Sequence, residues 1–155
     1  MDKLKVNTQK VRNQNLLDQC IAIRLTVFVD EQKVPLDEEL DEFDVHPEAC
    51  NHFLTKVDGV IAATGRSRIY DAETQVTYKL QRIAVLAEFR GCGIGRELVQ
   101  AMEHDAVKSG AQFTLLDAQC QAEPFYKKLG YVTLSEETFL DAGIPHVQMK
   151  KKLLL

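Results

Sequence analysis

Residues 90–95, with the sequence RGCGIG, place three glycines at alternate positions directly before a predicted helix. The first turn of a helix leaves backbone N–H groups without intrahelical partners, and the helix dipole makes that end partly positive. Glycines let the main chain turn tightly and approach a ligand closely. With the added charge of Arg90 and Arg96, this segment, which we call the glycine loop, predicts an anion site suited to a diphosphate.

Two other phosphate-binding patterns fit the glycine loop poorly. The dinucleotide fingerprint needs G-x-G-x-x-G within a parallel βαβ unit, whereas the spacing here is Gly91-x-Gly93-x-Gly95 after a predicted β meander. The nucleotide P-loop ending in Gly-Lys-Ser/Thr is absent from the sequence. A nucleotide-phosphate enzyme is therefore the weaker alternative, and glycines that only form a tight turn are the structural one.

Residues 37–44, DEELDEFD, carry six carboxylates and are called the acidic segment below. Such a run either forms a solvated loop or attracts a cationic, amine-bearing substrate. Arg24 has two matching interpretations, because arginine binds carboxylates and phosphates well: it contacts an anionic group of a substrate, or it pairs with the acidic segment. His52 and His146 are candidates for proton transfer, since histidine titrates near neutral pH, although a lone histidine is more often structural.

The elements that must position these groups follow from the hydrophobic pattern. Residues 14–29 and 95–108 show helical periodicity, and Gly110 is expected to end the second helix. A β meander occupies the middle of the chain, with Asp58-Gly59 as a hairpin turn. The predicted strands cover residues 3–6, 52–57, 60–70, 76–86, 113–118, 131–134 and 147–151, and a short helix covers 124–129, ended by Gly130. This order predicts an α+β fold with helices on the faces of a mixed sheet, in a single domain over residues 1–155.

Composition excludes several classes of function. The chain has 155 residues and a formal net charge of −4, so no basic surface favours nucleic acid. No apolar run approaches the roughly 18 residues that span a membrane, and the first residues do not resemble a signal peptide. The four cysteines show no metal-binding spacing. We expect free thiols, a cytoplasmic location, no nucleic acid partner, no membrane association and no metal.

Two motifs, in the expected order, carry a family resemblance. The pattern Arg90-x-x-Gly93-x-Gly95 resembles the R/Q-x-x-G-x-G/A signature of the GNAT superfamily of acetyltransferases, and residues 123–131, EPFYKKLGY, resemble its second motif. Residues 24–35, RLTVFVDEQKVP, and residues 141–149, DAGIPHVQM, are similar to motifs of the ElaA/YjcF-like branch. The resemblance covers nearly the whole chain.

The resemblance implies a GNAT (acyl-CoA N-acyltransferase) fold of about six or seven strands, with splayed strands at the cofactor site. It implies acetyl-CoA (coenzyme A) as the cofactor, with the backbone of the strand before the glycine loop holding the pantetheine amides and a main-chain donor at Val85 near the acetyl carbonyl. The cofactor-binding residues that it indicates are Ile83, Ala84, Val85, Arg90, Gly91, Cys92, Gly93, Ile94, Gly95, Arg96, Phe125, Tyr126 and Lys128. Cys92 is expected to be simply a small residue, with a redox role as the lesser alternative.

By the same resemblance, Tyr126 protonates the departing sulfur in a direct transfer to a primary amine. Gln81 stands where some relatives have a glutamate, so the base is sought among Glu31, Glu39, Asp41, His52 and His146, with His146 as the catalytic choice. The substrate-binding residues indicated are Arg24, Phe28, Glu31, Gln32, His52 and Gln81.

Several readings stay open from the sequence. A small-molecule amine is the expected acceptor, because the chain has no appended recognition domain. A protein-lysine or N-terminal acetyltransferase is a variant, and a non-catalytic acetyl-CoA-binding sensor is the main alternative, which Gln81 favours. A homodimer is expected from the resemblance alone.

Overall fold

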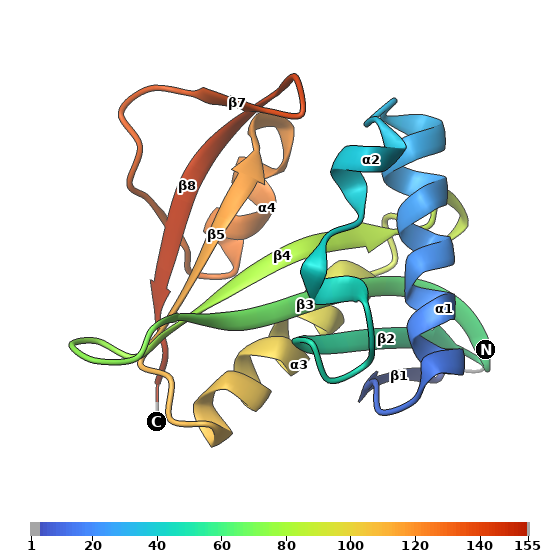
Figure 1. Ribbon diagram of the computed structural model, residues 1–155. Helices are drawn as coiled ribbons and strands as arrows, with labels where there is room; N and C mark the ends of the chain where they lie inside the picture. The colour runs from blue at the N-terminus through green and yellow to red at the C-terminus, as the bar shows by residue number, and fades with distance from the viewer. Residues whose placement is uncertain (1–3, 155) are drawn as a thin grey trace. The chain divides into compact units, whose positions relative to one another are not determined.

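The computed structural model describes residues 4–154, in which a first strand and a series of helical segments precede three consecutive strands, and further helices and strands follow (Figure 1). The strands are β1 (Val6–Lys10), β2 (Asn51–Val57), β3 (Val60–Asp71), β4 (Thr77–Val85), β5 (Phe113–Gln119), β6 (Val132–Thr133), β7 (Phe139–Asp141) and β8 (Ile144–Lys152). The helices are α1 (Gln14–Arg24), the π-helix η1 (Leu25–Glu31), α2 (Leu36–Glu39), η2 (Glu42–Asp44), η3 (Ala87–Phe89), α3 (Ile94–Lys108), η4 (Cys120–Ala122) and α4 (Glu123–Lys128).

The chain forms two compact units that are interleaved in sequence. The first comprises the residues up to Ser67 together with Arg82–Met102, and the second comprises Arg68–Gln81 together with the residues from Glu103 onward. The prediction of a single domain over residues 1–155 stays a prediction.

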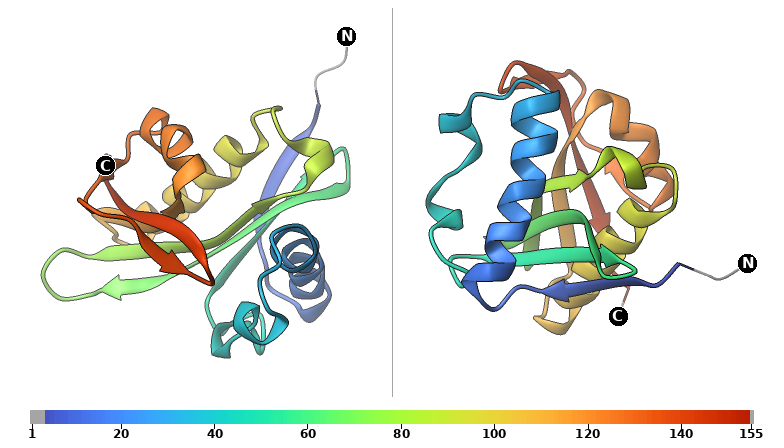
Figure 2. Two further views of the ribbon diagram at one scale, coloured as in Figure 1. Left: turned by 90° about the horizontal axis from the view of Figure 1, so that it is seen from above. Right: turned by 90° about the vertical axis from the view of Figure 1, so that its right-hand side faces the viewer.

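In the first unit, antiparallel strands are covered by α1. β2 pairs with both β1 and β3, and the Asp58-Gly59 turn joins β2 to β3 as predicted. The apolar face of α1 and η1 packs onto β2 and β4 through a buried cluster (Figure 2). The members of this cluster are Val11, Leu17, Cys20, Ile23, Val27, Leu54 and Ala84. The first turns of α3 cover the other face, where a Cβ on Gly65 would lie only 2.7 Å from the Met102 sulfur. Gly65 therefore allows β3 to approach α3 closely.

In the second unit, β4 and β5 are parallel and β8 is the central partner of the later strands. The β4–β5 register runs from Thr77↔Phe113 to Leu80↔Leu116, and α3 provides the crossover connection that parallel neighbours need. β8 pairs antiparallel with β5, β6 and β7. A separate buried cluster of Tyr78, Ala106, Ala111 and Leu153 lies at the far end of α3. The pairing is mixed and mostly antiparallel, which confirms the α+β fold class.

Most predicted elements are confirmed, and three differ. The helix expected at residues 14–29 starts correctly, because the Asn13 side chain accepts a hydrogen bond from the Leu16 N–H at 2.9 Å, but it continues from Leu25 as a π-helix. Apolar periodicity does not separate these two helix types. The first strand is Val6–Lys10 instead of residues 3–6, of which residue 3 lies outside the described residues. β7 is an additional strand whose three residues are all exposed, so no burial pattern announces it.

None of the helices in residues 4–154 is long and apolar enough to cross a membrane.

Candidate functional site

The glycine loop leads directly into α3, as the sequence predicts. Gly91 and Gly93 have φ angles of 78° and 80°, in the left-handed region that favours glycine. A Cβ at either position would meet nothing within 4 Å, so backbone conformation, and not crowding, requires glycine here. Ile94 is buried and anchors the first turn of the helix, whose leading N–H groups have no intrahelical acceptor. The loop therefore has the geometry of an anion site at a helix N-terminus.

Arg90 connects the glycine loop to the end of η1. Its Nε donates to the Val85 carbonyl at 3.0 Å, and its guanidinium lies 2.9 Å from the Glu31 carboxylate. Both side chains are partly exposed, at 46% and 35%. Glu31, expected to line the acceptor site, is thus the ion-pair partner of an arginine expected to contact the cofactor.

The last part of β4 extends beyond its pairing with β5. The register ends at Leu80↔Leu116, whereas β4 continues through Ile83 and Ala84 to Val85. Ala84 points into the buried cluster beneath α1, and its two neighbours are half-buried. The backbone of Ile83 and Val85 therefore lies outside the parallel ladder, where the predicted contacts with the pantetheine amides require it.

The Gln81 side chain has a hydrogen-bond-accepting oxygen without a donor. Its side-chain Oε1 is buried and finds no hydrogen-bond donor among the residues that the structure describes. Buried polar atoms are nearly always hydrogen-bonded in folded proteins, so such an atom is a candidate for contact with a ligand.

The acidic segment is a folded ion-pair network and not a solvated loop. The Arg24 Nε donates to Glu39 at 2.8 Å, and its two terminal nitrogens donate to the two Asp44 oxygens at 2.6 and 2.9 Å. A further bond reaches the Glu39 carbonyl oxygen. Of the two interpretations of Arg24, the internal ion pair is confirmed, and the side chain is only 1% exposed, so it is not open to an anion of the acceptor.

Arg66 completes this network. It lies on β3, where it contacts Asp41 at 2.7 Å and Asp44 at 2.9 Å. Burial alone would raise the pKa of Asp44, but the hydrogen bonds and charge of Arg24, the Asp41 N–H and Arg66 outweigh burial and hold that pKa well below its usual range. For Glu39 burial dominates and raises the pKa, although Arg24 and Arg82 oppose it. Neither carboxylate is free to accept a proton from an acceptor amine.

His52 is a buried structural residue, which corrects its expected role at the substrate. It is 1% exposed, and its Nε2 donates to the Phe43 carbonyl at 2.8 Å. Burial lowers the pKa of His52, so the neutral form is favoured. The histidine anchors the segment that follows the acidic residues and has no ring nitrogen presented to solvent.

In the second unit, α4 presents the predicted acid. Tyr126 is 8% exposed, and burial raises its pKa, so its hydroxyl keeps its proton throughout the neutral range. Its ring contacts Phe125 and Tyr131 edge to face, at centroid distances of 5.0 and 5.8 Å. Pro124 at the start of α4 fits the first turn of a helix, where no N–H is needed. Phe125 and Lys128, the other residues expected from this motif, are exposed.

Sequence reasoning missed the hydrogen-bonded cluster behind Tyr126. The Tyr131 hydroxyl donates to the buried Glu103 carboxylate at 2.8 Å and lies 2.8 Å from the Thr114 hydroxyl. Lys151 reaches the second Glu103 oxygen at 2.9 Å. In the sequence, this cluster could have been found from Glu103, a charged residue at a position where the apolar pattern of α3 predicts burial. This cluster fixes the ring against which Tyr126 packs.

His146 lies at the same end of β5 as α4. It is the register partner of Gln119, the last residue of β5, and η4 and α4 follow Gln119 at once. Its Nδ1 must carry a proton, because it donates to the Ile144 carbonyl at 2.6 Å. In neutral histidine, Nε2 is then the acceptor, which is the form that a base requires. The Phe139 ring stacks on the imidazole at 6.0 Å.

The structure also places two further residues expected at the substrate, the four cysteines and the potential metal-binding side chains. Phe28 and Gln32 are half-buried at the end of the first helical segment, where Phe28 packs against the buried cluster beneath α1. The four cysteines are free, and Cys92 is exposed in the glycine loop. Among residues 4–154, no three His, Cys, Asp or Glu side chains gather as a metal site requires.

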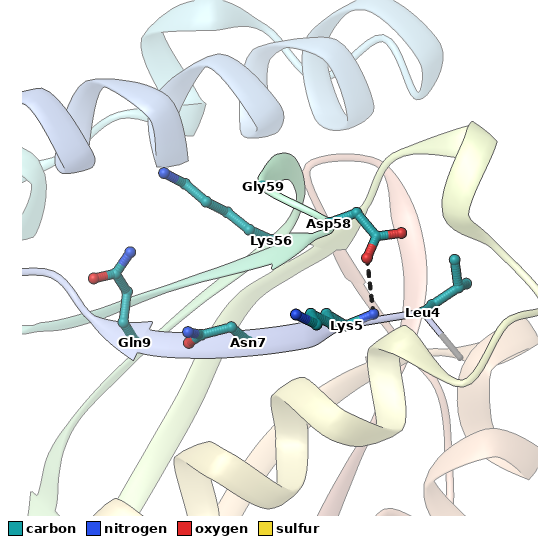
Figure 3. Close-up of a pocket in the computed structure, with 7 residues that line it drawn as sticks. All are labelled: Leu4, Lys5, Asn7, Gln9, Lys56, Asp58 and Gly59. Carbon is teal, nitrogen blue, oxygen red and sulfur yellow. Dashed lines mark hydrogen bonds between the residues drawn. The ribbon is translucent and has the colours of Figure 1, made fainter. Parts of the chain in front are cut away.

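A surface pocket of about 960 Å³ lies beside β1 and the β2–β3 turn (Figure 3). Its polar wall includes Lys56 and Asp58, and the Asp58 carboxylate accepts a bond from the Lys5 N–H at 3.0 Å. The lining residues are Leu4, Lys5, Asn7, Gln9, Lys56, Asp58 and Gly59. They include none of the predicted site residues, and the pocket offers no paired catalytic groups.

Comparison with known proteins places the chain in one family. The family model described as "Acetyltransferase (GNAT) domain" matches residues 14–153. The uncharacterized N-acetyltransferase YjcF of Bacillus subtilis is 43% identical over 140 residues, covering 90% of this chain and 95% of that protein.

Two solved structures share the fold at lower sequence identity. Escherichia coli ElaA has a TM-score of 0.80 at 21% identity, covering 97% of this chain and 100% of the other. Arabidopsis thaliana Naa50, solved with the bisubstrate analogue CoA-Ac-MVNAL, has a TM-score of 0.69 at 20% identity, covering 96% and 99%. Because the family model spans most of the chain, including residues 90–95 and 123–131, this protein belongs to the GNAT family of acetyltransferases and is an acyltransferase.

Proposed function

We propose that the protein transfers the acetyl group of acetyl-CoA directly to a primary amine on a small acceptor. The observation that carries this proposal is the glycine loop, in which Gly91 and Gly93 adopt left-handed conformations immediately before the N-terminus of α3. Backbone N–H groups at that position suit a diphosphate, which coenzyme A contains. The Arabidopsis relative in the same fold was solved with a CoA-containing analogue, which supports this choice of donor.

The described residues fit the proposed donor at three points. N–H groups from Gly91 to Arg96 would hold the diphosphate, with charge added by Arg90 and Arg96. The backbone of Ile83 and Val85, outside the β4–β5 ladder, would pair with the pantetheine amides. When bound, acetyl-CoA supplies an activated thioester, and a main-chain N–H near Val85 would stabilise negative charge on its carbonyl oxygen.

Two residues of the second unit are assigned the proton transfers. Tyr126 would donate its phenolic proton to the leaving sulfur when the acyl group passes from sulfur to the amine nitrogen. Burial raises the pKa of Tyr126 further above neutrality, so the hydroxyl is protonated at neutral pH. His146 accepts the proton that the amine loses, through Nε2, because Nδ1 is committed to the Ile144 carbonyl. Gln81 offers its unsatisfied Oε1 to the acceptor.

The test measures coenzyme A release from acetyl-CoA by the purified protein with a panel of primary amines. Tyr126→Phe is expected to lower kcat by about 10²–10⁴-fold, since it removes only the proton donor. Tyr70→Phe is the matched control, because it also removes a tyrosine hydroxyl, but from a side chain that is 55% exposed and lies outside the predicted site. Acetyl-CoA binding should persist in both variants.

The outcomes separate the candidate roles. Turnover with a small amine that falls in Tyr126→Phe and not in Tyr70→Phe supports the proposal. Tight acetyl-CoA binding without turnover on any small amine or peptide contradicts it and favours a sensor. Turnover on peptides alone moves the acceptor class to proteins.

A further inference from the structure

Arg82 interrupts strand β4 with an unusual backbone conformation. Its φ angle is 55°, in the left-handed region that residues with a Cβ rarely adopt. Residues held in such regions cluster at functional sites and persist only where their surroundings impose them. The interruption separates Thr77–Leu80, which pairs with β5, from Ile83–Val85, the predicted cofactor strand.

The Arg82 side chain is bound by the acidic segment. Its Nε lies 3.2 Å from a Glu39 carboxylate oxygen and donates to the Glu39 carbonyl at 3.3 Å. A terminal nitrogen lies 3.6 Å from the Asp41 carboxylate. The side chain is 24% exposed, so these contacts are only partly screened by water.

The partners of Arg82 are themselves fixed. Glu39 is held by Arg24 at 2.8 Å, and Asp41 is held by Arg66 at 2.7 Å. Both of these arginines are 1% exposed. Several hydrogen bonds restrain each of these buried ion pairs, although the Arg66 Nε has no hydrogen-bond partner among the described residues. Arg82 therefore connects a rigid network to the one left-handed residue of the described β4.

We infer that Arg82 is a positioning residue: its contacts with Glu39 and Asp41 hold the left-handed turn in β4 and thereby set the backbone of Ile83–Val85 for the acyl donor. This inference rests on the proposed function. It makes the acidic segment a support for the cofactor strand, in place of an attraction site for the acceptor.

Three substitutions separate the side-chain contacts from the backbone conformation. Arg82→Ala removes the contacts and keeps a Cβ that disfavours the turn, so we expect Kd and KM for acetyl-CoA to rise about 10-fold or more, with a smaller change in kcat. Arg82→Gly removes the same contacts but adopts positive φ without strain, so its Kd is expected within about threefold of the wild type. Arg82→Lys keeps the positive charge but loses the planar guanidinium with its several donors, so its Kd should lie between those of the alanine and glycine variants.

A destabilised control excludes a merely structural effect. Asn13→Ala removes the cap of α1 without touching β4, so it should lower the denaturation midpoint and leave acetyl-CoA affinity unchanged. Calorimetric titration and urea unfolding are measured for every variant. If Arg82→Ala does not fold, the glycine and lysine variants carry the comparison.

The result that overturns the inference is equal acetyl-CoA affinity in the wild type and all three Arg82 variants, or an affinity that follows stability across the whole set, Asn13→Ala included. Loss of affinity that is as large for glycine as for alanine also contradicts it. A wild type that binds no acetyl-CoA overturns the proposed function, and this inference with it.

Discussion

Arg90 donates to the Val85 carbonyl and pairs with Glu31, so its charge is partly compensated before any phosphate arrives. An exposed ion pair of this kind contributes only about 0.2–1 kcal/mol. A diphosphate carries more charge than one carboxylate and can compete for the same guanidinium. At the residue scale, Glu31 therefore acts as a weak competitor of the proposed donor.

We predict that Glu31→Gln tightens acetyl-CoA binding by up to about fivefold, because the arginine no longer leaves an ion pair. Arg90→Ala should weaken binding by about 3–10-fold. Asp30→Asn is the matched control, since it removes one exposed negative charge from the same helix and should change little. Calorimetry at low salt checks all three, and weaker binding by Glu31→Gln contradicts the prediction.

From the sequence, Arg24 and the acidic segment of the ion network were identified, but Arg66, Arg82 and the pairing of these groups were not. Arg66 and Arg82 stand within strands that read as apolar or alternating, which marks them as unusual. Arg24 had two interpretations of similar weight, because a charge run and an arginine fix no distance between them. Only the fold brings Arg24, Arg66 and the acidic segment together.

At the element scale, the proposed donor site consists of α3 and the glycine loop before it. Gly93 is required by its φ angle of 80°, whereas Gly95 lies inside the helix, where glycine is unfavourable for folding. Close approach of the proposed donor would account for a glycine that does not favour the helix.

Two alanine substitutions in this element should have opposite effects on stability. Gly93→Ala forces a Cβ into the left-handed region and should destabilise the fold by about 1 kcal/mol. Gly95→Ala should leave stability unchanged or raise it by up to about 1 kcal/mol, because alanine favours the helix. Both should weaken acetyl-CoA binding, since Gly95→Ala adds a methyl group where the diphosphate is proposed to bind. Urea unfolding and calorimetry test this, and unchanged affinity in Gly95→Ala contradicts it.

Helices and strands with a clear apolar periodicity, and turns marked by glycine, could be predicted from the sequence, whereas other elements could not. Apolar periodicity predicted the helix at residues 95–108, which the structure has at Ile94–Lys108, and glycine marked the turns at Gly59, Gly110 and Gly130. The polar edge strand β1 and the exposed β7 lack an apolar pattern and depend on pairing with β2 and β8. The π-helix η1 shares its apolar pattern with an ordinary helix.

For the whole molecule, stability depends on buried charge. Asp44 has a pKa well below its usual range, so its stabilisation is complete above the unfolded-state value of about 4 and is lost as pH falls through the lower folded-state value. Glu39 has a raised pKa, so its ionisation lowers the stability of the fold as pH rises, which is opposite to the effect of Asp44. A comparison between variants isolates the contribution of Asp44.

We predict that Asp44→Asn destabilises the chain at pH 7 by about 3–5 kcal/mol, because it leaves the buried Arg24 and Arg66 without one of their carboxylate partners. The difference from the wild type should shrink as pH falls below about 4, where the Asp44 carboxylate of the unfolded wild type begins to protonate while that of the folded wild type stays ionised. Asp37→Asn, in an exposed position of the same segment, should be neutral throughout. Urea unfolding between pH 2.5 and pH 7 (approximate limits of a practical titration) measures both, and a difference independent of pH contradicts the assignment.

Calorimetric titration with acetyl-CoA, alongside S-acetylpantetheine, tests the proposed donor site most directly. The second ligand keeps the thioester and the pantetheine amides but lacks the diphosphate. We expect acetyl-CoA to bind with a micromolar Kd, about −8 kcal/mol, and S-acetylpantetheine to bind at least about 100-fold more weakly. No binding of acetyl-CoA, or equal affinities for the two ligands, would contradict a donor site built on the glycine loop.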